Sequence, residues 1–165
     1  MLIVKDSMVL IHLAKITLLE KSCDYFKNVL IPELVQEEVL KKKHPDSILI
    51  EELIVKNKIK VKGIKNNALL KRAEEFNILR GEAEAVALYW QENAEYLATD
   101  DDNVRKKNLL LDLKVIGTLS ILLTLYKKKI IEKEKIIKAI DKLRQIGWFS
   151  NIVLDKIMME VENNE

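Results

Sequence analysis

The sequence predicts an α/β fold in which helices cover a small, central, parallel sheet. Short apolar runs of strand length alternate with longer segments of helical periodicity along the chain. Parallel strands need connections of about that helical length. The 4 Gly and 2 Pro are too few for the many tight turns of an all-β sandwich. The 165 residues are predicted to form one domain, 1–165, in which 130–165 is a helical C-terminal extension.

Four short apolar runs are predicted to be strands: 2–5, 29–31, 96–99 and 114–116. Each ends at a residue that stops a strand or begins a helix. Asp6 follows the first run and Asp100 the third, and Gly117 closes the fourth. Pro32 follows the second, where it suits the first turn of a helix.

The segments between these runs carry apolar residues at helical spacing. The predicted helices are 7–18, 32–39, 46–56, 66–76, 81–92, a short one from 103, and 118–126. The clearest is 81–92, in which Ala83, Val86, Ala87 and Trp90 form the stripe of a buried helix.

Two amphipathic helices, 132–145 and 150–162, are predicted to form the extension. The apolar face from Ile136 to Ile146 is wide and needs a cover, either the chain's own sheet or a second copy. We therefore expect a homodimer that involves this tail or the helix ending at 126.

Composition excludes several classes of site. The net charge of +2 is no strong signal for nucleic-acid binding. One cysteine, Cys23, forms no intramolecular disulfide and fits a reducing compartment, and with two histidines it is too little for a structural zinc site. No apolar run reaches the roughly 18 residues of a membrane span, and Asp6 comes too early for a signal peptide. We expect a cytoplasmic protein that does not enter a membrane.

Carboxylates occur near the predicted strand ends, on four separate segments. Active sites of open parallel sheets lie beyond the carboxyl ends of the strands, so these side chains are expected at one edge of the sheet. The candidates are Asp6, Glu38, Glu82, Glu84, Asp100 and Asp101. Asp6 and Asp101 carry most weight, because both follow apolar runs where a buried charge has no structural benefit.

A cluster of carboxylates is unfavourable unless a cation neutralises it. Oxygen ligands suit Mg²⁺ or Mn²⁺, and such ions promote phosphodiester hydrolysis by activating water. Each acid also has an ordinary explanation: Asp6 would cap the helix that follows it, and Glu38 would be an exposed helix residue.

Glu82 and Glu84 differ by about 200° around their helix, so they cannot both face one site from the same turn. We expect one to face the metal and the other to cap a helix N-terminus or meet a lysine. The spacing alone does not choose between them.

Other residues near these segments have two interpretations. Arg105, Lys106 and Lys107 follow the last acids, and would either contact RNA phosphates or form a solvated helix face. His12 is expected to be buried and hydrogen-bonded rather than a general base. Trp148, in the tail, is expected to serve core or dimer packing rather than base stacking.

Five segments resemble, in order and spacing, the motifs of PIN-domain proteins. They are Ile3–Ser7 with the following Leu10–Lys15, Ile31–Val39, Gly81–Leu88, Thr99–Asp101 and Val115–Leu119. The third and fifth are similar to signatures of a PIN-like subgroup related to VapC toxins. The resemblance runs from residue 2 to about 126 and implies a PIN-like α/β/α sandwich.

The resemblance also implies an activity and its partners. It implies a Mg²⁺- or Mn²⁺-dependent endoribonuclease, commonly the toxin of a type II toxin–antitoxin pair. Such toxins cut structured RNA of the tRNA or rRNA class, are held inactive by a small antitoxin, and are often dimers.

Carried over to this chain, the motifs imply a set of site residues. The catalytic acids are Asp6, Glu38, Glu84 and Asp101, with Glu82 as the alternative to Glu84. The metal ligands are drawn from these acids, Glu82 and Asp100. Ser7 and Thr99 are the polar supports beside the metal.

Two other functions compete with this one. The first is a PIN-like module with a weakened site that binds RNA or protein without cutting. The second is a phosphatase-like or flap-nuclease-like enzyme on a related sheet. A manganese titration separates nuclease from binding module, because only the former needs the acids to bind a divalent cation.

Overall fold

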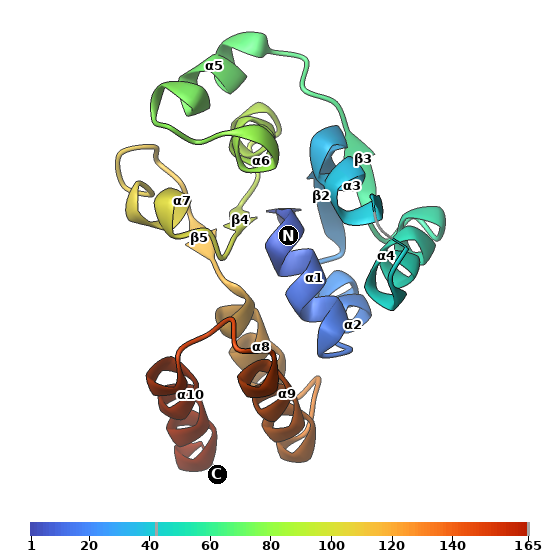
Figure 1. Cartoon of the computed structure of the whole chain (residues 1–165), viewed down its shortest axis with the longest axis vertical. Helices are drawn as coiled ribbons and strands as arrows, with labels where there is room; N and C mark the ends of the chain where they lie inside the picture. The colour runs from blue at the N-terminus through green and yellow to red at the C-terminus, as the bar shows by residue number, and fades with distance from the viewer. Residues whose placement is uncertain (42, 165) are drawn as a thin grey trace.

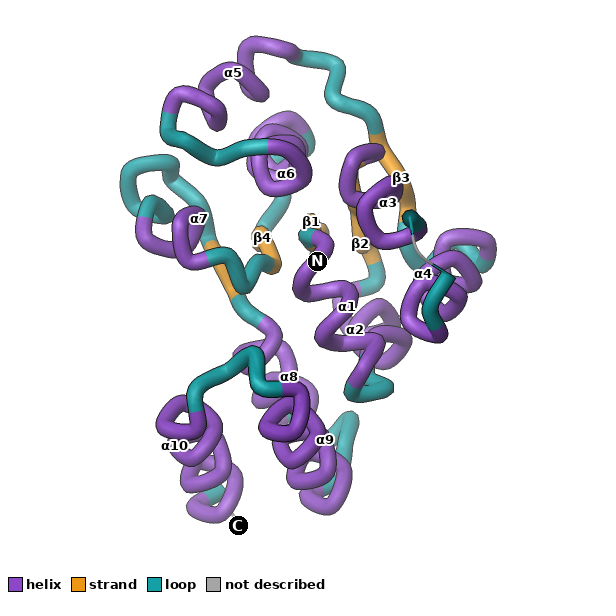
Figure 2. The backbone as a smooth tube through the Cα atoms, in the orientation of Figure 1, coloured by secondary structure: helices purple, strands orange, loops and turns teal. Residues whose placement is uncertain are grey.

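The computed structural model describes residues 1–41 and 43–164, and within them the chain forms a five-stranded parallel sheet (Figures 1 and 2). The strand order is β3-β2-β1-β4-β5, and every neighbouring pair is parallel. The strands are β1 (Leu2–Lys5), β2 (Asn28–Pro32), β3 (Lys60–Lys62), β4 (Tyr96–Ala98) and β5 (Val115–Ile116). The predicted α/β class with a small parallel sheet is confirmed.

Helices connect the strands and continue beyond the last one. They are α1 (Ser7–Lys15), α2 (Leu19–Phe26), α3 (Glu33–Leu40), α4 (Pro45–Val55), α5 (Asn67–Glu75), α6 (Arg80–Gln91), α7 (Asp102–Lys106), α8 (Thr118–Lys127), α9 (Lys133–Ile146) and α10 (Asn151–Asn163). Over the part of the chain that the structure describes, no helix combines the length and apolarity that a membrane span requires.

Both faces of the sheet are buried. In β1, the central strand, Ile3 joins the core formed with α1, α2 and α8, and Val4 joins the core under α6. Neither side chain is exposed. Side chains alternate between the faces of a strand, so a strand covered on both sides is apolar throughout and carries little period-two signal.

Two elements were not predicted. The helix predicted over 7–18 ends at Lys15, before Thr17 with its φ of 58°, and α2 over Leu19–Phe26 is an additional helix. The edge strand β3 is three residues long and has lysines on both sides of Val61, so it has no apolar run of its own. It forms because Val61 pairs with Ile31 of β2.

The C-terminal helices pack against each other and against α8 (Figure 1). Ile136, Ile140 and Leu143 of α9 are fully buried, and Leu154 of α10 joins the same core. The wide apolar face of α9 is thus covered by helices of the chain itself and not by its sheet. This removes the reason for expecting the dimer to form through that face.

Candidate active site

Asp6 lies at the carboxyl end of β1, beside the end of the adjacent strand β4. Its backbone N–H donates to the carbonyl of Ala98 at 3.0 Å. Its carboxylate caps α1 by accepting from the N–H of Val9 at 3.0 Å, and its other oxygen accepts from the Thr99 hydroxyl. The side chain is held from both strands and is only 2% exposed. Thr99 therefore hydrogen-bonds directly to the Asp6 carboxylate, as its predicted supporting role requires.

The electrostatic environment of Asp6 is unfavourable to its charge. Burial raises the pKa of Asp6 to about 7 despite the hydrogen bonds from Thr99 and Val9, and the nearby negative charges of Asp100 and Glu82 add to the rise. Without a cation this acid is partly protonated at neutral pH. A bound divalent ion would restore its charge.

Glu38, on α3, is held by two donors from other segments. Ser7 donates to its Oε2 at 2.5 Å, and the N–H of Gly81 donates to its Oε1 at 3.1 Å. The carboxylate lies so close to α6 that a Cβ atom added to Gly81 would be 2.6 Å from both oxygens. Only glycine leaves room for Glu38 at this end of α6, where the helix dipole also favours a negative charge.

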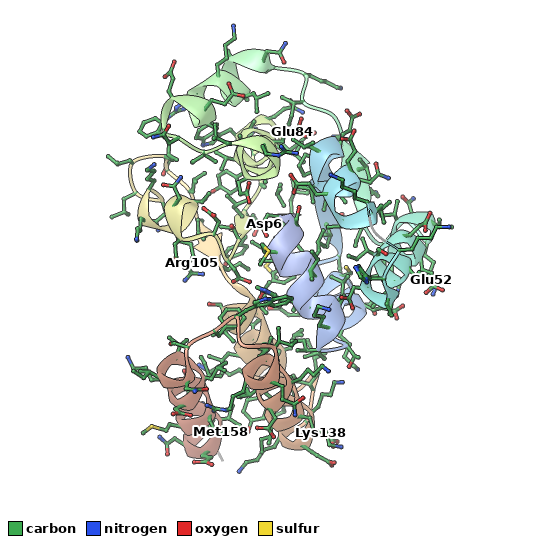
Figure 3. The ribbon with its side chains drawn as sticks, viewed as in Figure 1. Asp6, Glu52, Glu84, Arg105, Lys138 and Met158 are labelled. Carbon is green, nitrogen blue, oxygen red and sulfur yellow. The ribbon has the colours of Figure 1, made fainter. Side chains whose placement is uncertain are left out.

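The two glutamates of α6 have different surroundings. Glu84 Oε2 accepts from the backbone N–H of Leu34 at 3.0 Å, at the first turn of α3 (Figure 3). Glu82 instead has its pKa raised by burial and by the charges of Glu38 and Asp101. The structure places Glu82 with the other acids and turns Glu84 to the N-terminus of α3. The geometry therefore favours Glu82 over the predicted Glu84 as the third acid.

Asp101 is fixed by the turn that follows β4. Its backbone N–H donates to the Thr99 hydroxyl at 3.1 Å, and its carboxylate caps α7 by accepting from the N–H of Val104 at 2.9 Å. Through its charge it interacts with Glu82. Asp101 thus remains with Asp6, Glu38 and Glu82 in one electrostatic cluster.

Asp100 hydrogen-bonds to residues of α8 and α1, while its charge still acts on Asp6. One oxygen accepts from the N–H of Thr118 at 2.8 Å, and the other meets the Thr118 hydroxyl and His12 Nδ1, the latter at 2.7 Å. Burial alone would raise the pKa of Asp100, but the hydrogen bonds from His12 and Thr118 outweigh it and hold the pKa below its usual value. Both oxygens accept hydrogen bonds, so Asp100 joins α1 to α8, and its role as a metal ligand stays a prediction.

The three basic residues of the α7 region have different surroundings. Arg105 Nη1 lies 3.4 Å from the carbonyl oxygen of Thr99 and packs over Gly117, close to Asp100. Lys107 donates to the carbonyl of Phe76, away from them. Lys106 is exposed. Only Arg105 is placed at the site by contacts of its own.

The donor set of the cluster suits a hard divalent cation. Asp6, Glu38, Glu82 and Asp101 offer only carboxylate oxygens, and two of them have raised pKa values. In residues 1–41 and 43–164, however, no three His, Cys, Asp or Glu side chains are gathered closely enough to hold a metal ion. The residues fit the ion by their chemistry, while their side chains do not form a coordination shell.

Two glycines at the site were named from the sequence only as a strand end and as the start of a motif, without a role in the site. Gly81 makes room for Glu38, and Gly117 makes room for the Arg105 guanidinium and the Asp100 carboxylate. A glycine in the first turn of an otherwise regular helix, as at Gly81, is a usable signal, because it lowers helix propensity without a turn to explain it.

A family model described as a PIN domain matches residues 2–163. Comparisons with curated proteins and with solved structures gave no match. PIN domains are in general nucleases and typically use divalent metal ions. The match spans nearly the whole chain, and the parallel sheet with acids at its carboxyl edge agrees with it. The chain belongs to the PIN-domain family.

Proposed function

We propose that this protein is a divalent-metal-dependent endoribonuclease. The observation that carries the proposal is the cluster of Asp6, Glu38, Glu82 and Asp101, which four segments deliver to one edge of the sheet. The pKa values of Asp6 and Glu82 are raised chiefly by burial, and neighbouring carboxylates add to the rise, as at many functional sites. Family membership supports nuclease chemistry of this kind.

The chain's own residues would hold the ion and position the substrate. Mg²⁺ or Mn²⁺, when bound, activates water and stabilises charge on the phosphodiester. Thr99 and the α1 cap hold Asp6 in one orientation, while Ser7 and Gly81 do the same for Glu38. Arg105, beside the acids, is placed to neutralise a phosphate.

The direct test is cleavage of RNA by purified protein with Mn²⁺ or Mg²⁺. Wild type is expected to cut and to lose activity in EDTA, and Asp6→Asn is expected to be at least about 100-fold slower. Asn can still cap α1, so the variant should fold. Glu84→Gln is the matched control, and it should lose much less than Glu82→Gln. Equal cutting by wild type and Asp6→Asn would refute the assignment.

We further propose that the protein acts as the toxin of a type II pair, with structured RNA of the tRNA or rRNA class as substrate and a small antitoxin as partner. The resemblance of its motifs to VapC-like toxins supports this. Expression of wild type should slow growth, and Asp6→Asn or Asp101→Asn should relieve the effect. A small reading frame beside the gene whose product restores growth would identify the antitoxin. Growth equally slowed by wild type and both variants would contradict the proposal.

A second candidate function is a PIN-like module that binds RNA or protein without cutting it. The observation that favours it is that the described acids do not converge around one point. Titration calorimetry with Mn²⁺ separates the two. The nuclease proposal requires binding that Asp6→Asn abolishes, whereas the binding module predicts no such heat and no cleavage.

A further inference from the structure

Trp148 lies between α9 and α10 and presents an aromatic surface close to the acids. Its ring packs against His12 of α1, with ring centroids 4.4 Å apart, and 44% of the residue is exposed. Lys15 also lies over the indole, 5.8 Å from its centroid. An indole held from within the protein yet half open is poorly explained by core packing alone.

Trp148 lines a cavity of about 510 Å³ that extends toward the active site. His12, Phe149, Asp100, Arg105 and Gly117 are among the residues that line it. The volume is within the range of pockets that hold small ligands. On the other side, Trp148 shares a cavity of about 380 Å³ with Glu38, one of the proposed ligands. The indole therefore lies beside the catalytic cluster.

One buried nitrogen of His12, a residue that lines the cavity, has no partner in the part of the chain that the structure describes. His12 Nδ1 is bonded to Asp100, while His12 Nε2 is buried and has no hydrogen-bond partner among the described residues. A buried polar atom without a partner costs free energy.

The cavity is lined by charged side chains as well as by the indole. Arg105 and the Trp148 indole both line it, and Arg105 Nη1 lies 3.4 Å from the carbonyl oxygen of Thr99. Asp100 and Asp102 also line the cavity, but His12 and Thr118 already hydrogen-bond to the carboxylate of Asp100. The lining offers an aromatic stacking surface and a guanidinium, which are groups that the base and the phosphate of a nucleotide can satisfy.

We propose that this cavity binds an unpaired nucleotide of the substrate RNA, with the base stacked on Trp148 and its phosphate at Arg105. The inference rests on the proposed function, since it takes the ligand to be RNA. In duplex RNA the faces of the bases are covered by their neighbours, whereas bases of loops and single strands can be splayed out and stacked on aromatic side chains. The site therefore selects unpaired segments.

Binding of a fluorescein-labelled, eight-nucleotide single-stranded RNA tests the proposal. The assay uses anisotropy, EDTA and the Asp6→Asn background, so that cleavage does not interfere. Stacking of one base contributes about 1–3 kcal/mol. Trp148→Leu should therefore weaken binding roughly 5- to 150-fold, and Trp148→Phe should retain most of the affinity. Leucine keeps apolar packing against His12 but has no aromatic face, and thermal unfolding of each variant checks the fold.

Two controls define the specificity. Leu109→Ala changes another exposed apolar residue, which is 90% exposed, and should leave the affinity unchanged. A duplex of the same sequence should bind more weakly than the single strand. In a Trp90→Phe background, Trp148 is the one remaining tryptophan of the sequence, and the single strand should quench its fluorescence.

The outcomes separate this proposal from the nuclease proposal. Equal affinity of wild type and Trp148→Leu, absence of quenching, or no RNA binding at all would overturn the nucleotide site, even if the protein cuts RNA. Trp148-dependent binding by a protein that cleaves nothing would support the nucleotide site and refute the nuclease.

Discussion

At the scale of single residues, the end of β1 places two buried ionisable side chains next to each other. Lys5 is fully buried on the α2 side of the sheet, and Asp6 is nearly so at the active-site edge. Buried charges are unfavourable unless they are paired or functional. Because one is an acid and the other a base, their burial predicts opposite changes in stability as the pH rises.

Asp6 should make the metal-free protein less stable as the pH rises. Its pKa is 3.8 as a model value and about 7 in the fold, so the folded state binds more protons between these values. The free energy of unfolding therefore falls between pH 4 and 7, by on the order of 4 kcal/mol at most. Asp6→Asn should lack this loss and be the more stable form at pH 8. Thermal unfolding in EDTA from pH 4.5 to 8 tests it, and parallel curves would contradict it.

Lys5 behaves in the opposite sense. Burial lowers its pKa to about 8, although its ammonium is bonded to Ser22 and lies 5.5 Å from the ring centroid of Phe26. Stability should rise as the pH goes from about 8 toward 10.5, where the unfolded state still holds the proton. The double variant Lys5→Met, Ser22→Ala should be about 1–3 kcal/mol more stable at pH 7.

Urea denaturation at pH 7 and at pH 10 checks the Lys5 prediction. The gain should shrink at pH 10, because wild-type Lys5 is then largely neutral in the fold. Ser22→Ala alone is the control for the lost hydroxyl. A lower urea midpoint for the double variant at pH 7 would show that the buried ammonium is net favourable.

At the scale of elements, one residue at the N-terminal end of α6, Gly81, affects both the stability of the helix and the position of Glu38. Gly81→Ala should leave the free energy of unfolding unchanged or raise it by up to about 1 kcal/mol, because alanine favours a helix. The same methyl group would displace the Glu38 carboxylate, the flexible end of its side chain. Metal-dependent cleavage should fall, by up to about 100-fold for a displacement near 1 Å.

Gly63→Ala is the matched control for that prediction. Its added Cβ would lie 3.2 Å from an oxygen of Glu33, outside the acid cluster. Cleavage rates and unfolding curves of both variants give the comparison. Loss of stability and activity together in Gly81→Ala would mean that the helix, and not the position of Glu38, had been damaged.

The strands and helices also differ in how well the sequence alone predicts them. Strands β1, β2, β4 and β5 have apolar runs, and β3 has one apolar residue between lysines, so its pairing with β2 is a tertiary effect. The acids at strand ends follow from the same pattern. The choice between Glu82 and Glu84 does not, because it depends on where α6 meets α3. The hydrogen bonding of Asp100 likewise depends on His12, which lies 88 residues away in the chain.

At the scale of the whole molecule, the predicted homodimer needs a surface other than the covered face of α9. Ile152 and Met159 of α10 are 70% and 60% exposed and lie seven residues apart, on one side of the helix. We propose that they form the contact between copies. Light scattering at tens of micromolar should show a dimer, and Ile152→Asp with Met159→Asp should show a monomer. Wild-type monomer at that concentration would contradict the proposal.

The bond between Thr99 and Asp6 joins residues 93 apart in the chain, and Trp148 reaches back to His12 near the beginning. Contacts of such high sequence separation form late in folding, because long loops must close first. During synthesis, β1 and α1 leave the ribosome long before β4 is made. An incomplete chain therefore holds Asp6 without Thr99 or Asp101, so the proposed site stays unassembled until β4 and the turn after it have left the ribosome.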